Sequence, residues 1–194
     1  MEVKLRREIK DFGPLTPLIG AWYGETGKDV SPEEDGSKEL NDYQETLVFE
    51  AIEDVDNAEE QELVVVRYEQ VVIRIRDGKM IHNESGYYSW DSEQDLIMKS
   101  FSIPRGVSVI AGGQINQSEK GIDIKVSASK DSQDWQIAES PFMQKKAKTL
   151  SYEFTLTLNG DSLSYSQKMA LDIYGNHFEH SDKNELTRSA QVIK

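Results

Sequence analysis

The stretch KTLSYEFTLTLNGDSLSYSQKMALDI, residues 148–173, decides the fold. Apolar and polar residues alternate in it with a period of two, which is the pattern of a β-strand with one buried and one solvated face. The apolar positions are Leu150, Tyr152, Phe154, Leu156 and Leu158 in the first half and Leu163, Tyr165, Met169, Leu171 and Ile173 in the second. Asn159-Gly160 lies between the halves, and this dipeptide favours the positive φ values of a two-residue hairpin turn. The stretch therefore predicts two antiparallel strands joined by a tight turn.

Similar alternating runs recur along the chain, separated by turn sequences such as Asp77-Gly78 and Lys120-Gly121. They cover approximately residues 20–26, 43–52, 63–76, 79–90, 95–103, 106–116, 121–129 and 177–188. With the hairpin above they make about ten antiparallel strands, and an up-and-down β-barrel would pair the edges that such a long meander otherwise exposes. We therefore expect an all-β chain with a single domain over residues 1–194. The barrel, over residues 20–190, would enclose one small-molecule ligand.

The first nineteen residues have a different pattern. Leu5, Ile9 and Phe12 recur at helical spacing, and Pro14 to Ile19 can form a second short turn before the first strand. We expect residues 1–19 to be a short helical segment that closes one end of the barrel. A helix that docks on a membrane is the alternative, although a short basic amphipathic stretch binds membranes weakly.

Composition excludes several classes of protein. The net charge of −13 and the pI near 4.7 come without a basic stripe, so we expect no nucleic-acid partner. The absence of cysteine excludes disulfides, thiolate metal sites and cysteine nucleophiles. No window resembles a signal peptide or a membrane span, which predicts a cytoplasmic protein without a membrane partner. Separately, we expect either a monomer or a homodimer. No Gly-x-Ser-x-Gly elbow is present, which argues against a serine hydrolase.

An acidic segment, EDVDNAEEQE at residues 53–62, carries six acids and no base. A block of like charges repels itself, so a solvated hairpin loop is the expected structure. Calcium binding is the alternative, but the acids lack the alternate spacing and the central glycine of an EF-hand loop.

Two motifs at opposite ends of the chain belong together. GAWYG places Trp22 between Gly20 and Gly24 on the first strand, and LTR places Arg188 near the end of the last. This arrangement resembles the pattern of lipocalins, fatty-acid-binding proteins and avidins, in which the tryptophan packs under a basic residue of the last strand. We expect the Arg188 guanidinium to stack on the Trp22 indole as a structural closure.

The three histidines can be sorted by strand parity, because residues two apart on a strand share a face. His180 travels with Phe178 and Leu186 and is expected to face inward, whereas His177 shares its face with charged residues and is expected to face solvent. This division argues against a metal clamp made of both. On residues 79–90, the same argument places His82 inward. The plain alternative for either inward histidine is an imidazole hydrogen-bonded to a carboxylate in a polar interior.

Four stretches together resemble the nitrobindin-like heme-binding β-barrel family, which is also described as fatty-acid-binding-protein-like and belongs to the calycin superfamily. They are PLTPLIGAWYGETGKD, KMIHNESGYYSWD, SIPRGVSVIAGG and LSYSQKMALDIYGNHFEHSDKNELTR, and they span residues 14–188. The resemblance implies a ten-stranded barrel that holds heme b, with His180 as the axial ligand of the iron. It implies that His82 and Met80 line the heme pocket, and we place Tyr165 with them because it faces inward.

The family resemblance also implies a function, namely binding of nitric oxide at ferric heme and isomerisation of peroxynitrite to nitrate, so that the chain could be a peroxynitrite isomerase. The context Asn176-His177-Phe178-Glu179-His180 is more polar than the usual family pattern, which indicates a bacterial side branch. Arg105 is expected at a plain turn position, with pairing to a heme propionate as the alternative.

Two other hypotheses remain open. The first is a non-catalytic carrier of a fatty acid or another hydrophobic ligand, in which the inward Tyr152 and Tyr165 would help to hold a carboxylate. The second is a barrel that has lost its ligand, in which Asp182, Glu84 and Tyr165 only satisfy the two inward histidines.

Overall fold

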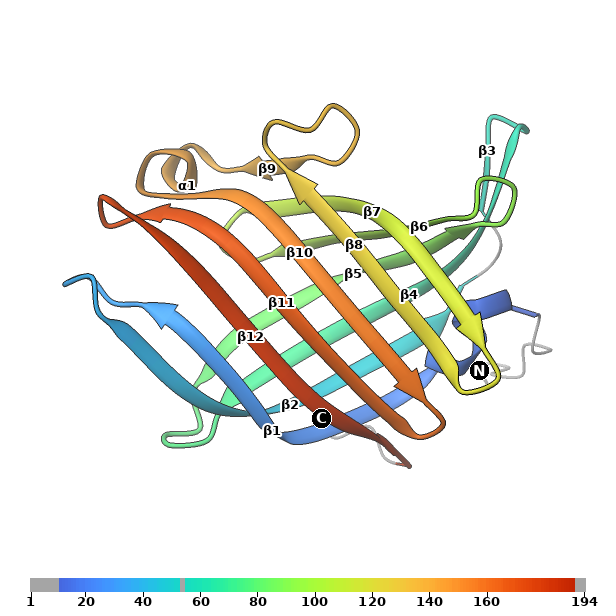
Figure 1. The fold of residues 1–194 in the computed structure, drawn as a ribbon, viewed down its shortest axis with the longest axis horizontal. Helices are drawn as coiled ribbons and strands as arrows, with labels where there is room; N and C mark the ends of the chain where they lie inside the picture. Colours follow the sequence, from blue (N-terminus) through green and yellow to red (C-terminus); the bar gives the residue numbers. More distant parts are fainter. Residues whose placement is uncertain (1–10, 53–54, 191–194) are drawn as a thin grey trace, which may run out of the picture.

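Ten long antiparallel strands close into a barrel in the computed structural model, which describes residues 11–52 and 55–190 (Figure 1). They are β1 Gly20–Pro32, β2 Lys38–Ala51, β4 Gln61–Arg74, β5 Met80–Asp91, β6 Leu96–Ile103, β7 Val107–Ser118, β8 Gly121–Ser129, β10 Ala147–Asn159, β11 Ser162–Ile173 and β12 Asn176–Ser189. Neighbours in this series pair with one another, and β1 pairs with β12 to close the ring. The predicted fold class is confirmed.

Four shorter elements lie outside the ring. The 3-10 helix η1 spans Gly13–Leu18, the strands β3 and β9 span Val55–Asn57 and Ile137–Glu139, and the helix α1 spans Pro141–Lys146. β3 and the start of β4 form an exposed hairpin, as expected of the acidic segment, although residues 53–54 lie outside the described residues. β9 and α1 were not predicted, because three or six residues are too few to show a period of alternation.

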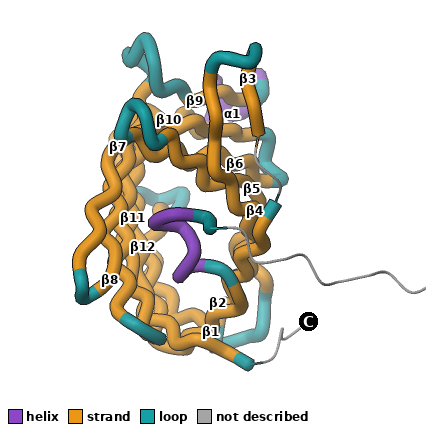
Figure 2. The backbone as a smooth tube through the Cα atoms, turned by 90° about the vertical axis from the view of Figure 1, so that its right-hand side faces the viewer, coloured by secondary structure: helices purple, strands orange, loops and turns teal. Residues whose placement is uncertain are grey.

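The helix η1 closes one end of the barrel, and Figure 2 shows it lying across that opening. Leu15 and Leu18 are fully buried there, and the Trp22 indole N–H donates a 2.8 Å hydrogen bond to the Leu18 carbonyl. The helical segment expected over residues 1–19 therefore appears as η1 in the described part of the chain. Leu5 and Ile9, which suggested an earlier helix, lie outside the described residues.

The contact expected between the chain ends is present at this closed end. The Arg188 guanidinium carbon lies 4.2 Å from the centroid of the Trp22 ring. Arg188 also donates hydrogen bonds to the backbone carbonyls of Pro17 and Ile19, at 2.7 and 2.9 Å. Gly20 has φ of +131°, which an L side chain rarely adopts, and a Cβ at Gly24 would stand 2.3 Å from a β12 carbonyl. Gly20 therefore permits the backbone conformation at the start of β1, and Gly24 allows β1 to approach β12 closely.

Bulges shift the alternation at three places. Leu150 is an extra residue in the pairing of β10 with β11, so Thr149 takes the buried position and Leu150 is only half-buried. The placement of Leu150 on the inward face was therefore wrong. A second shift lies between Gly24 and Gly27 of β1, and a third makes Ile81 an extra residue opposite Val72 and Ile73. The apolar inward faces of the strands elsewhere form one continuous core.

Candidate functional site

A cavity of about 380 Å³ opens at the barrel end opposite η1. This volume falls within the usual range for small-molecule sites. One side of its wall is apolar and includes Phe101, Ile103, Val107, Met143, Met169, Leu171 and Ile173. The other side is polar and includes Asp29, Ser31, Asn41, Gln70, His82, Glu84, His180 and Asp182. The barrel is therefore hollow at this end, which disfavours the hypothesis that side chains have replaced its ligand.

His180 lies on β12 and lines the cavity, as its parity predicted. Its Nε2 is 2.7 Å from the Asp29 carboxylate on the adjacent strand β1. Burial alone would raise the pKa of Asp29, but hydrogen bonds with His180 and Asn41 lower it below its usual range. The Nδ1 atom of His180 makes no hydrogen bond with any described residue. One ring nitrogen is thus held by a carboxylate, and the other has no hydrogen-bond partner among the described residues.

His177 has the opposite environment. Its side chain is 65% exposed on the outer face of β12 and lies 3.3 Å from Asp172. The parity argument that separated the two neighbouring histidines is confirmed. A metal site made of His177 and His180 together is excluded by their positions on opposite faces of the strand.

His82 lines the cavity from β5. Along the ring of strands, β5 is four steps from β12 in one direction and six in the other, so His82 and His180 approach the cavity from nearly opposite walls. His82 Nε2 is 3.3 Å from Glu84 Oε2. Met80, which was expected to share the face of His82, lies beyond the bulge at Ile81, where it is 53% exposed at the cavity mouth and still contributes to the lining.

Asp182 lies near both histidines and faces the cavity from β12. Burial raises its pKa to about 6, although the His180 and His82 imidazoles lower it in part. Its carboxylate accepts a 2.9 Å hydrogen bond from the Gln167 side chain. The effect of burial on the pKa of Asp182 therefore outweighs the effect of the two histidines. This carboxyl group stays protonated to a higher pH than an exposed aspartate does.

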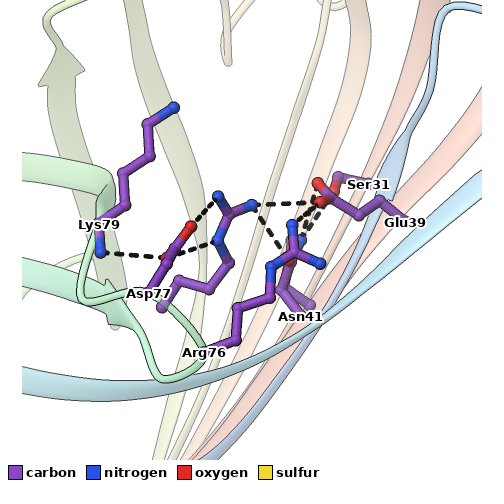
Figure 3. Close-up of polar contacts among 8 residues, drawn as sticks. Ser31, Glu39, Asn41, Arg76, Asp77 and Lys79 are labelled. Atoms are coloured by element: carbon purple, nitrogen blue, oxygen red, sulfur yellow. Dashed lines mark hydrogen bonds and ion pairs between the residues drawn. The ribbon is translucent and has the colours of Figure 1, made fainter.

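A cluster of charged side chains from β2, the end of β4 and the turn between β4 and β5 lies at one side of the cavity, and Figure 3 shows its polar contacts. Arg74 is held by Asp77 at 2.6 Å and by Glu39 at 3.1 Å, and Arg76 also pairs with Glu39. The ammonium group of Lys79 points away from this cluster in Figure 3. Among the described residues, no partner contacts the ammonium group of Lys79 or the guanidinium group of Arg105, and both residues line the cavity. The mouth therefore presents two cations that are free to meet an acidic ligand.

Tyr165 occupies a different place from the one expected of a pocket residue. It is buried beneath the cavity and is not among the residues that line it. Its hydroxyl donates a 2.8 Å hydrogen bond to Glu45 and lies 2.8 Å from the hydroxyl of Tyr43. Tyr152 is likewise buried and accepts a hydrogen bond from Lys99. Both tyrosines are thus engaged in internal networks and do not form a carboxylate site with Arg188.

Sequence reasoning missed Asp29 and Lys99. Lys99 had a visible signal, because it lies between Ile97 and Phe101 on an inward face of alternating residues. Asp29 had none: β1 was expected to end near residue 26, and the shift between Gly24 and Gly27 breaks the parity that Trp22 would set.

These features define a barrel with an internal small-molecule site, and the comparisons with known proteins agree. The model of the THAP4-like, heme-binding β-barrel domain matches residues 11–188. The chain belongs to this family. A solved structure, that of Rv2717c from M. tuberculosis, has a TM-score of 0.69 and 22% sequence identity, over 90% of this chain and 94% of that one. At this identity the likeness shows a shared fold. No significant match is found among curated proteins.

The residues of the cavity fit a heme. A histidine with a carboxylate on its other nitrogen is the usual arrangement of a metal ligand, and His180 with Asp29 has it. The apolar wall suits the faces of a porphyrin, and the cations Lys79 and Arg105 suit its two propionates. Within the described residues, no three His, Asp or Glu side chains group as a metal-binding set. In the described part of the chain, no helix has the length and apolar character to span a membrane.

Proposed function

We propose that the chain binds a b-type heme in this cavity with His180 as the axial ligand, and that the site acts on nitric oxide or isomerises peroxynitrite to nitrate. The observation that carries the proposal is His180 itself. It is an inward histidine of the last strand, it is anchored by Asp29, and its second nitrogen has no protein partner among the described residues. The family gives the coarser part of the proposal, which is heme binding.

Four of the lining residues would have definite roles in holding the heme or facing its ligand. Asp29 would orient the His180 ring and increase its basicity toward a metal. The cations Lys79 and Arg105 would hold the propionates at the mouth. His82 would face the ligand from the wall across the cavity. When bound, the heme would supply a redox-active iron that can bind a small ligand.

The carrier hypothesis has less support. Fatty-acid carriers hold the carboxylate with an inward arginine and a tyrosine, but Arg188 lies at the closed end on Trp22. Tyr152 and Tyr165 are held in buried hydrogen bonds and do not reach the cavity surface. A carboxylate ligand would have to use Lys79 or Arg105 at the mouth, and these residues serve heme propionates equally well.

A hemin titration followed by absorption tests the proposal. The wild-type protein should give a saturable Soret band at one hemin per chain, and His180→Ala should lose most of it because the iron has lost its axial ligand. His177→Ala is the matched control, since it removes a histidine three residues away on the outer face. Equal Soret bands in the two variants would show that His180 is not the ligand.

A further inference from the structure

Three charged side chains form a continuous chain of contacts beside the cavity. His82 Nε2 is 3.3 Å from Glu84 Oε2, and Lys99 Nζ is 2.8 Å from Glu84 Oε1. The Tyr68 hydroxyl also donates a short hydrogen bond to Glu84. Glu84 and Lys99 are 1% and 2% exposed, whereas the His82 side chain is 31% exposed and faces the cavity. The chain of contacts therefore leads from the interior of the barrel to the ligand space.

The Lys99 side chain is almost completely buried. Its ammonium lies 4.3 Å from the centroid of the Phe101 ring and 4.5 Å from that of Phe154, and it donates a 2.7 Å hydrogen bond to Tyr152. Taking two charges out of water is costly, so a buried pair of this kind is poorly explained as a device for stability alone. What the pair does achieve is to fix the position and the charge of Glu84. Burial raises the pKa of Glu84, but Lys99 and His82 lower it to about 2.

His82 receives the effect of this fixed carboxylate. The charged groups facing it are Glu84 on its own strand, Lys99 on β6 and Asp182 on β12, while its register partner on β4 is the apolar Val72. Burial lowers the pKa of His82, but the hydrogen bond and charge of Glu84 raise it above its usual value. Glu84 engages Nε2, and Nδ1 has no partner among the described residues. In the protonated imidazole, the Nδ1–H group can donate a hydrogen bond to a ligand.

We propose that Glu84 and Lys99 position His82 as a charged hydrogen-bond donor, so that the cavity selects small anions such as oxyanions and pseudohalides. Glu84 and Lys99 are positioning residues, and His82 is the residue that contacts the anion. The inference deepens the proposed function, because it rests on the same cavity and names the ligand class that His82 would accept opposite His180. The geometry of His82 is present without any heme, so the inference can be tested separately.

The first experiment uses the protein without hemin and follows the imidazole signals of its three histidines by NMR as the pH is changed. Glu84→Gln should move the titration midpoint of His82 to lower pH. Because that change leaves Lys99 buried without its partner and can impair folding, the double variant Glu84→Gln, Lys99→Met should be measured as well. Asp172→Asn is the matched control: it removes a carboxylate that is also 3.3 Å from a histidine, His177, but on the outer surface.

Azide then serves as the anion probe in the same samples. It should shift the His82 signals of the wild-type protein at a pH below the His82 midpoint, and this shift should be lost in the double variant. In hemin-loaded protein, azide binding should weaken at least about tenfold in the double variant, which corresponds to about 1.4 kcal/mol, because the anion loses a charge-assisted hydrogen bond. Binding of nitric oxide, which is neutral, should change little.

A His82 midpoint that is unchanged in both variants would overturn the inference, as would azide that leaves the wild-type His82 signals unmoved. Parallel losses of azide and nitric oxide binding would also overturn it, because they would indicate general damage to the cavity. Failure of hemin to bind would contradict the proposed function alone, since the measurements without hemin decide the role of His82 by themselves.

Discussion

Glu45 is a carboxyl group buried beneath the cavity without a cationic partner among the described residues. It accepts hydrogen bonds from Tyr165 and Gln70, both at 2.8 Å, and from Asn184 at 2.9 Å. Burial raises its pKa to about 7, and the three hydrogen bonds offset only part of that effect. Near neutral pH a fraction of the molecules therefore carries a proton on this interior acid.

The raised pKa of Glu45 makes stability depend on pH. Between the unfolded value of 4.5 and the folded value of about 7, the folded chain holds a proton that the unfolded chain has lost. Stability therefore falls as the pH rises through this window, by roughly 2–4 kcal/mol from this group. Glu45→Gln should flatten this part of the stability curve, which urea unfolding at pH 5 and pH 8 would measure. An equal loss of stability over that interval in the variant and the wild type would contradict the assignment.

Residue placement on the strands could be predicted wherever alternation is unbroken. The orientations of His82, His177 and His180 followed from parity alone, because strands in a barrel present one face to the interior. The partner of His180 could not be predicted, since Asp29 comes from a strand 151 residues earlier in the chain and beyond a bulge. Pairing between distant strands is a property of the closed ring and leaves no local signal.

At the scale of elements, the closed end of the barrel depends on one arginine. Arg188 connects β12 to η1 through the carbonyls of Pro17 and Ile19, stacks on Trp22 of β1, and donates a 2.7 Å hydrogen bond to Asp161 in the turn before β11. Its side chain thus joins the first strand, the last strand and the segment that covers the opening. The motif that suggested this closure from sequence was therefore informative about tertiary structure.

Replacement of Arg188 by Met should destabilise the fold by about 2–4 kcal/mol, because it removes two charge-assisted hydrogen bonds to carbonyls and the contact of a cation with an indole ring. Arg67→Met on β4 is the matched control, since Arg67 makes only an exposed ion pair with Glu50 at 3.4 Å. Such pairs contribute less than about 1 kcal/mol. Thermal and urea unfolding would measure both variants, and similar losses in the two would argue against a closing role for Arg188.

Bulges were the part of the elements that the sequence did not reveal. An extra residue at Leu150 or Ile81 disrupts the hydrogen-bond ladder only locally and has no signature in composition, so the alternating pattern looks intact on both sides of it. The consequence for the site is visible at Met80, which the bulge displaces toward solvent relative to His82. The short insertion with β9 and α1 was missed for a related reason, since its elements are shorter than a detectable period.

At the scale of the whole molecule, the architecture could be predicted almost completely. Ten alternating segments with turn signals between them leave few ways to pair all edges, and a closed meander is the simplest. The polar half of the cavity could not be predicted as a unit, because its residues come from strands that are distant in sequence. Asp29, His82 and His180 line the same cavity only because β2 pairs with β4 and β1 pairs with β12.

The central claim is that a heme occupies this cavity with its iron at His180. The most direct test is an anomalous diffraction map of hemin-loaded crystals, recorded at the iron absorption edge. The account predicts one iron peak inside the barrel, at bonding distance from a ring nitrogen of His180. An iron peak outside the barrel, or one bonded to His82 or His177, would contradict it.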